Sequence, residues 1–293
     1  MITIMTPTYN RAYILGNAYN SLRNQSSFDF EWIIVDDGST DDTEQIVMKW
    51  IAEEKNFSII YEKQKNGGKH RAVNRGVALA HYDYFFILDS DDTLTDNAVA
   101  KIHEWIAGIA GLSGFAGIAG LKGNADVAIG GTPQEEYIDA TNLERKKYGL
   151  LGDKAEIYKT EILKQYPFPE FEGENFIRES AVWDHIAKDG LKIRWFNEII
   201  YLCDYIEDGL TKNTNANTYA KNFMGFTYCS RLFLETHSFM PSLNKCGEFR
   251  RVAKLKGLKL TESAKLLNVN ILHLIMGIWY FNLRQFVKSI FRK

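Results

Sequence analysis

The chain has 293 residues, 45% hydrophobic and 25% charged, which is ordinary for a globular protein with room for one domain and a smaller appendage. Its formal net charge of -2 gives no general affinity for nucleic acid, so we expect no nucleic-acid partner. The cysteines Cys203, Cys229 and Cys246 are widely spaced and odd in number, which argues against a disulfide framework and favours a cytoplasmic location.

The first residues lack the basic and long apolar regions of a signal peptide, and we expect a strand there instead. Strand-like and helix-like segments then alternate. We expect strands at residues 2–5, 31–35, 57–61 and 84–88, and helices at 13–22, 46–51 and 72–80. A capping box of Asp41 and Glu44 should start the second helix. This alternation predicts an α/β fold with a mostly parallel sheet flanked by helices.

Glycine recurs at every third position from Gly108 to Gly123, a period that matches neither helix nor strand. We interpret it as the end of a helix followed by a small-residue strand near residues 115–121. Further strands are expected at 125–129, 155–158, 192–196 and 199–202, a helix at 181–188, and only helices from Tyr219 onward. We predict a main domain at 1–215, divided into halves 1–107 and 108–215, and a helical extension at 216–293.

The most informative segment is an apolar run at 84–88 that ends in Asp89, Asp91 and Asp92. Crowded carboxylates at the end of a buried strand repel one another unless a cation offsets their charge. Hard divalent cations prefer such oxygen ligands, and open α/β sheets bind ligands at this edge. We predict a Mg²⁺ or Mn²⁺ site. The alternative is an acidic turn in which Asp91, Asp92 or Thr93 caps the next helix.

Polar residues follow the other three strands as well. They are Thr6, Thr8, Tyr9 and Asn10 after the first, Asp36 and Asp37 after the second, and Gly67, Gly68, Lys69, His70 and Arg71 after the third. In a parallel sheet these loops share one edge with residues 89–92. Carboxylates for a base, an aromatic ring that stacks on it, and cations for phosphates together suit a nucleotide diphosphate.

Four motifs between residues 7 and 92 resemble those of family 2 glycosyltransferases. They are Pro7-Thr8-Tyr9-Asn10-Arg11, Val35-Asp36-Asp37-Gly38-Ser39-Thr40-Asp41, Asn66-Gly67-Gly68-Lys69 and Leu88-Asp89-Ser90-Asp91-Asp92. The resemblance implies the Rossmann-like GT-A fold, a nucleotide-sugar donor of UDP type, and inversion at the anomeric carbon. It further implies roles for single residues: Thr6, Thr8, Tyr9, Asp36 and Asp37 hold the base and nearby groups, Lys69 lies near uracil or the diphosphate, Asp89 lies near the ribose, and Asp91, alone or with Asp89, binds the metal as part of a DxD-type motif.

An inverting transfer also needs a general base for the acceptor hydroxyl. The family carries an acidic pair ahead of a Gly-aromatic-Lys turn. Here Arg178-Glu179-Ser180 precedes Gly190-Leu191-Lys192, which departs from the usual Glu-Asp pair. The register assigns Glu179 as the base, with Asp184 as runner-up. Glu179 could instead be a carboxylate favoured by a helix N-terminus, and Asp184 could pair with Lys188.

Residues 166–176 and 205–210 resemble bacterial members that build capsular or surface polysaccharides. We expect these loops to shape a site for a saccharide or lipid-linked acceptor. The sequence holds no Gln-x-x-Arg-Trp motif, so we expect transfer of one sugar per encounter. Two alternatives stay open: a non-catalytic nucleotide-sugar-binding module, and a sugar-nucleotide nucleotidyltransferase, whose Gly-rich N-terminal loop is absent. A dinucleotide dehydrogenase is disfavoured because no GxGxxG follows the first strand.

The C-terminal segment 248–293 is basic and rich in large apolar residues, with ten lysines and arginines against Glu248 and Glu262. A basic amphipathic helix can lie on an anionic leaflet. We therefore expect a peripheral location on the inner face of the cytoplasmic membrane. The alternative is a helix packed on the rest of the protein with a solvated basic face.

Overall fold

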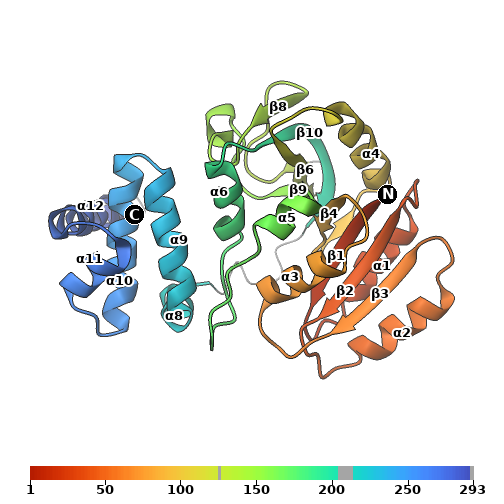
Figure 1. The fold of residues 1–293 in the computed structure, drawn as a ribbon, viewed down its shortest axis with the longest axis horizontal. Coiled ribbons are helices and arrows are strands. Elements are labelled where there is room, and N and C mark those ends of the chain that lie inside the picture. The colour runs from red at the N-terminus through yellow and green to blue at the C-terminus, as the bar shows by residue number, and fades with distance from the viewer. Residues whose placement is uncertain (125–126, 204–213, 291–293) are drawn as a thin grey trace. The chain divides into compact units, whose positions relative to one another are not determined.

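The computed structural model describes residues 1–124, 127–203 and 214–290 (Figure 1). The chain divides into two compact units. One comprises residues 1–168 and 186–206, and the other comprises residues 169–185 and 207–293.

The first unit is built on a mixed sheet. Its strands within the described residues are β1 (Ile2–Thr8), β2 (Phe30–Asp36), β3 (Ser58–Lys63), β4 (Tyr84–Ile87), β5 (Thr93–Leu94), β6 (Phe115–Asn124), β7 (Val127–Ala128), β8 (Tyr137–Ala140), β9 (Lys154–Lys159) and β10 (Lys192–Leu202). The order is β3-β2-β1-β4-β9-β6-β10-β5, with β7 beside β6 and β8 beside β10. Strands β1 to β4 are parallel, whereas β9 runs antiparallel to both β4 and β6.

Helices cover both faces of this sheet (Figure 1). They are α1 (Leu15–Arg23), α2 (Thr43–Glu53), α3 (Lys69–Leu79), α4 (Ala98–Ile109), α5 (Thr160–Gln165) and the short 3₁₀ helix η1 (Arg145–Tyr148). Ile2 and Ile4 on one side of β1 join a core with residues of α1, α2 and α4. On the other side, a Cβ on Gly76 of α3 would lie 2.6 Å from Met5 Cγ, so glycine lets α3 approach β1 closely. The predicted α/β architecture is confirmed.

The second unit is helical. It contains α8 (Ala216–Lys221), α9 (Phe223–Thr236), α10 (Phe239–Leu255), α11 (Leu260–Leu267) and α12 (Ile271–Ile290), and α6 (Ser180–Lys188) begins in it. Aromatic and aliphatic side chains form its core, in which Phe226 stacks on Phe249 with centroids 5.7 Å apart and on Tyr219 with centroids 4.7 Å apart. The predicted helical C-terminal region is confirmed.

Several local predictions need correction. Strand β1 continues to Thr8, so Thr6 and Thr8 lie in the strand and not in the loop after it. The expected capping box is absent, because Asp42 is the N-cap of α2 and Asp41 bonds Thr43 and Ala12 instead. The two strands expected at 192–202 are one strand, β10, with register irregularities against β6. Residues 205–210, expected on the acceptor side, lie outside the described residues. The predicted domain boundary at 215 stays a prediction.

Candidate nucleotide-sugar site

The sheet has a topological switch point between β1 and β4. From β1 the chain moves to β2 and β3 on one side, then returns to β4 on the other side of β1. Loops that leave such neighbouring strands diverge and open a crevice at their carboxyl ends, where α/β folds bind ligands. The residues after β1 and β4 are therefore placed together by the topology.

The loops after β1 and β2 are tied to each other through Asn10. This residue adopts a left-handed conformation, with φ of 51°, which asparagine tolerates better than most residues. Its N–H donates to Ser39 Oγ at 2.8 Å, and its Oδ1 accepts from the Thr40 N–H at 2.8 Å. Tyr9, which precedes it, is 48% exposed. The arrangement fixes Asn10 against the loop after β2 and leaves the ring of Tyr9 accessible to a ligand.

Asp36 and Asp37 are both buried and both accept hydrogen bonds from the protein. Asp36 accepts from the Tyr61 hydroxyl at 2.6 Å and from the Ser39 N–H at 2.7 Å. Asp37 accepts from Gln64 and from the N–H groups of Gly67 and Gly68 at 2.9 and 2.7 Å. These carboxylates shape the loops. Their contact with a base stays a prediction.

Lys69 and Asp89 form the ion pair at the centre of the site. Lys69 is the first residue of α3 and not part of a loop, because the turn before it ends at the helix N-cap Gly68, with φ of 97°. The Lys69 Nζ lies 2.6 Å from Asp89 Oδ1, and each side chain is 27% exposed. A cation at the start of α3 and a carboxylate just after β4 thus form an ion pair at the edge of the sheet where the sequence predicts a diphosphate.

The three carboxylates after β4 differ in the direction in which their surroundings shift their pKa values. Burial would raise the pKa of Asp89, but the ammonium groups of Lys69 and Lys122 outweigh it and hold that pKa below its usual value. Burial and the charge of Asp89 raise the pKa of Asp91, and they raise the pKa of Asp92 to about 7. The surroundings therefore favour the ionised form of Asp89 and disfavour the ionised forms of Asp91 and Asp92.

Tyr201 of β10 buttresses this cluster from far along the sequence. Its hydroxyl accepts from the Asp89 N–H at 2.9 Å and bonds the Asp92 carboxyl. The Lys122 ammonium lies 3.9 Å from the centroid of the Tyr201 ring. Sequence reasoning missed Tyr201 and Lys122, because nothing in a strand segment shows which distant strand will lie beside it. An ionisable residue in the glycine-rich strand β6 was the one available signal for Lys122.

The acidic segment does not cap a helix. Residues Thr93 and Leu94 form β5, and α4 begins at Ala98 with Asn97 as its N-cap, so the alternative reading of the segment is wrong. Among the residues that the structure describes, no three His, Cys, Asp or Glu side chains form a ready-made metal site. Mg²⁺ and Mn²⁺ need less, since one or two carboxylates and the substrate's phosphates suffice. The raised pKa values of Asp91 and Asp92 fit a group that a cation would neutralise.

The two threonines of β1 differ in their partners. Thr6 Oγ1 accepts from the Trp32 indole N–H at 2.9 Å, so it is held within the core. In the described part of the chain, the buried Thr8 Oγ1 has no hydrogen-bond partner. Buried hydroxyls are normally satisfied, and an orphan at the last residue of β1 fits a ligand group at the switch point.

The predicted base and its runner-up belong to the second unit, whereas the donor residues belong to the first. Glu179 is exposed and directly precedes α6, with its carbonyl accepting from the Val182 and Trp183 N–H groups. Asp184 is half-buried within α6. Arg178 beside Glu179 bonds the Tyr219 hydroxyl and lies 5.0 Å from its ring centroid, which anchors the start of this segment.

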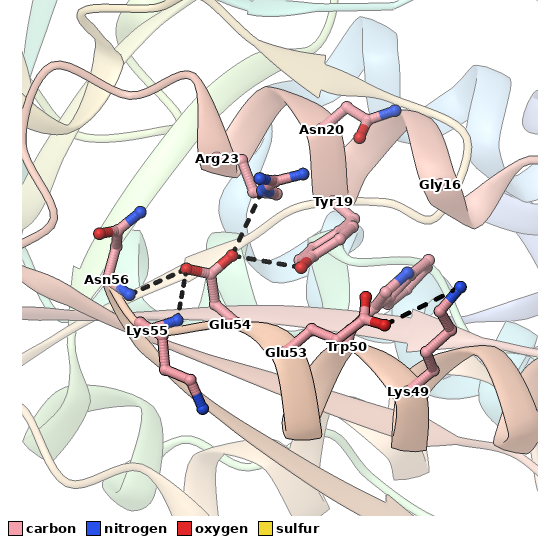
Figure 2. Close-up of a pocket in the computed structure, with 10 residues that line it drawn as sticks. All are labelled: Gly16, Tyr19, Asn20, Arg23, Lys49, Trp50, Glu53, Glu54, Lys55 and Asn56. Carbon is pink, nitrogen blue, oxygen red and sulfur yellow. Dashed lines mark hydrogen bonds and ion pairs between the residues drawn. The ribbon is translucent and has the colours of Figure 1, made fainter.

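A surface pocket of about 490 Å³ between α1 and α2 contains none of the predicted site residues (Figure 2). Glu54 dominates it and is satisfied by its neighbours. It accepts from the Tyr19 hydroxyl at 3.2 Å and from two backbone N–H groups, and it lies 3.5 Å from Arg23 Nε. Because the Glu54 carboxylate in this pocket already has partners within the protein, we assign the nucleotide-sugar site to the edge of the sheet.

The fold is of the GT-A type that the sequence resemblance implies. Residues 3–110, which are less than half of the chain, match the model of the family described as Glycosyl transferase family 2. The expected family is thereby confirmed.

Relatives of this chain among the curated proteins are also named as sugar transferases. Abequosyltransferase RfbV of Salmonella typhimurium is 38% identical over 109 residues, 36% of this chain and 32% of that protein. The GalNAc(5)-diNAcBac-PP-undecaprenol beta-1,3-glucosyltransferase of Campylobacter jejuni is 24% identical over 64% of this chain and 60% of that protein. Both alignments span less than two thirds of the relative.

Two solved structures share the fold over 96% of this chain. TarS 1–349 of S. aureus in complex with UDP-GlcNAc has a TM-score of 0.63 at 19% identity, with 89% of that chain covered. Mannosyltransferase PcManGT of Pyrobaculum calidifontis in complex with GDP-Man and Mn²⁺ has a TM-score of 0.55 at 14% identity, with 86% covered.

Proposed function

We propose that this protein transfers one sugar from a nucleotide-sugar, with UDP as the nucleotide, to a saccharide or lipid-linked acceptor in bacterial surface polysaccharide synthesis. The observation that carries the proposal is the meeting of Lys69, Asp89 and Asp91 at the switch point of a family 2 domain. The solved complexes of TarS with UDP-GlcNAc support the donor, and the Campylobacter relative, named for an undecaprenol-linked substrate, supports a lipid-linked acceptor.

The residues divide the work in this proposal. Thr8 and Tyr9 contact the base, Lys69 donates to the diphosphate, and Asp91, with Asp89 nearby, would hold Mg²⁺ or Mn²⁺. The metal would stabilise the charge that develops on the leaving diphosphate. The structure of PcManGT with Mn²⁺ supports a metal.

The transfer proceeds with inversion in one displacement. The Glu179 carboxylate, or Asp184 in its place, takes the proton of the acceptor hydroxyl. The acceptor oxygen forms a bond to the anomeric carbon, and the bond from that carbon to the diphosphate oxygen breaks with its electron pair. The nucleoside diphosphate leaves, and the base later returns its proton to solvent.

The first experiment measures thermal stabilisation and slow hydrolysis with UDP-, GDP-, CMP- and dTDP-sugars in the presence of Mn²⁺. We expect one UDP-sugar to raise the melting temperature of the wild type and to be hydrolysed by it. The same donor should neither stabilise Asp91→Asn nor be hydrolysed by it. Asp96→Asn is the matched control, because Asp96 is exposed two residues beyond β5. Equal hydrolysis by Asp91→Asn and the wild type would exclude Asp91 as the metal ligand.

A second experiment separates the enzyme from the two alternatives. Glu179→Gln should retain donor binding and lose transfer, whereas Glu172→Gln, at another exposed position of the same segment, should retain both. A binding module would show donor binding without hydrolysis in the wild type. A nucleotidyltransferase would release pyrophosphate from a nucleoside triphosphate and a sugar phosphate, and this reaction should be absent.

A further inference from the structure

Helix α12 exposes a wholly apolar face. Its inner side, with Leu274, Gly277 and Phe281, is buried within the second unit. On the opposite side every residue is large, apolar and at least 41% exposed: Leu272, Ile275, Met276, Trp279, Leu283, Phe286, Val287 and Ile290. At 100° per residue these eight fall on one stripe that runs the length of the helix. Contiguous apolar surface of this kind marks an interaction site.

The helix cannot roll to hide this face. It crosses α10 at two glycines, where a Cβ on Gly277 would lie 2.5 Å from Cys246 Cβ and a Cβ on Gly247 would lie 2.2 Å from Phe281 Cβ. Any other inner face would place a bulkier side chain at this crossing. Phe239, itself 55% exposed, packs edge-on against His273 with ring centroids 5.5 Å apart and extends the apolar area to α10.

The charge around the face selects its partner. Residues 248–293 hold ten basic and two acidic residues, which leaves 25 basic and 35 acidic residues in 1–247 of a chain with 35 and 37 in total. The C-terminal segment is thus at +8 and the remainder at -10. Helix α12 itself carries Arg284 and Lys288 and no acidic residue, and both cations lie outside the apolar stripe. A second copy of this face would bring like charges together.

We propose that α12 lies flat on a bilayer with anionic headgroups, with its apolar face among the acyl chains and with Arg284 and Lys288 at the phosphates. A strongly amphipathic helix with aromatic residues on one face and cations on the other binds in this way. Among the described helices, none alone is long and apolar enough to cross a membrane, although α11 and α12, bent by 101°, pass that test as a pair. Membrane binding of α12 would hold the protein beside a lipid-linked acceptor. The binding itself does not require that the protein be an active transferase.

Flotation of the full chain with vesicles tests this surface. Vesicles with about 30% phosphatidylglycerol should bind the protein at least about tenfold more tightly than pure phosphatidylcholine vesicles, and NaCl should weaken this binding. The double variant Trp279→Ser and Phe286→Ser should lose at least about tenfold in partitioning. Leu112→Ser, at a 44% exposed position of the first unit, should bind like the wild type.

Two results would overturn the proposal. One is failure to float, or flotation that the double variant and the wild type share. The other is a concentration-dependent dimer, seen by light scattering and abolished by the double variant, because a second copy would then occupy the face. Circular dichroism of the double variant should match the wild type, since both replaced side chains are exposed. Arg284→Gln with Lys288→Gln should reduce the preference for anionic vesicles and leave neutral binding unchanged.

Discussion

Asp37 holds the turn that precedes Lys69, and its replacement by asparagine tests this directly. Oδ1 accepts from Gln64 Nε2 at 2.8 Å and from the Gly67 N–H at 2.9 Å, while Oδ2 accepts from the Gly68 N–H at 2.7 Å. Both carboxylate oxygens therefore face donors, and the side chain is buried. An amide can offer one oxygen only. Whichever way it is turned, its NH₂ group points at an N–H donor.

The expected cost follows from this count. At least one charge-assisted hydrogen bond, of about 1.5–3 kcal/mol, is lost, and the bonds that remain become neutral ones of about 0.5–1.5 kcal/mol. Asp37→Asn should therefore lower the free energy of unfolding by about 2–4 kcal/mol, measured by urea denaturation at constant m-value. Asp42→Asn, exposed and at the N-cap of α2 without a side-chain bond, should change it by less than about 0.5 kcal/mol.

Donor binding should fall with stability. The Gly67–Gly68 turn leads directly into Lys69, so a displaced turn moves the cation that meets Asp89. We expect UDP affinity to drop at least about tenfold, which titration calorimetry would measure. Unfolding curves of Asp37→Asn that coincide with those of the wild type would refute the reasoning. Lost stability with intact UDP affinity would show that the turn does not position Lys69 for binding of the donor.

Two further predictions concern single lysines. Burial lowers the pKa of Lys154, whose Nζ donates to the Ile129 carbonyl at 3.1 Å, to about 8. Above pH 8 the unfolded chain therefore binds more protons than the folded chain, and the free energy of unfolding should rise with pH. Urea titrations should show a rise of about 1–3 kcal/mol between pH 8 and pH 10 relative to Lys154→Met. Parallel pH profiles of the two proteins would contradict this. Lys69→Met removes the direct ion-pair partner of Asp89 and should lower stability by about 1–3 kcal/mol and UDP affinity at least about tenfold, whereas the exposed Lys65→Met should change neither.

The half of the sheet that carries the candidate donor site can be predicted from the sequence because its signals are local. Strands β1 to β4 alternate with helices, and each strand is followed within a few residues by its polar loop. Parallel order then brings those loops to one edge without further information. The position of Asp91 beside Asp89 could be predicted for this reason.

The second half of the sheet could not be predicted in the same way. Strand β9 inserts antiparallel between β4 and β6, and Tyr201 reaches Asp89 across 112 positions of sequence. Such pairings depend on which side chains pack against each other after the chain has folded. A strand segment alone carries no mark of its neighbour.

The glycine period of three has several local causes and no common one. Gly111 and Gly114 adopt φ of 74° and 79° in the connection before β6, a conformation that favours glycine. Gly117, Gly120 and Gly123 lie within β6, where a Cβ would meet neighbouring atoms at 2.1, 2.7 and 2.5 Å. Gly108 lies in α4 with open space around it, its nearest neighbour being Arg194 Nη1 at 3.7 Å. The regular spacing therefore combines two different constraints with one position, Gly108, where no neighbouring atom requires glycine.

Alanine at three of these positions should separate the constraints by magnitude. At Gly117 the added Cβ would lie 2.1 Å from the Ile157 carbonyl oxygen, and because both are backbone of paired strands, we expect a loss of about 3 kcal/mol or more. At Gly111 only the positive φ opposes alanine, which costs about 1–2 kcal/mol. At Gly108 alanine should stabilise α4 by up to about 1 kcal/mol. Urea midpoints in the order Gly108→Ala, wild type, Gly111→Ala, Gly117→Ala are expected, and insolubility of the last would fit its place. A destabilised Gly108→Ala would show that glycine is required at this position for a reason other than its neighbours, and a Gly111→Ala as stable as the wild type would show that the positive φ does not oppose alanine there.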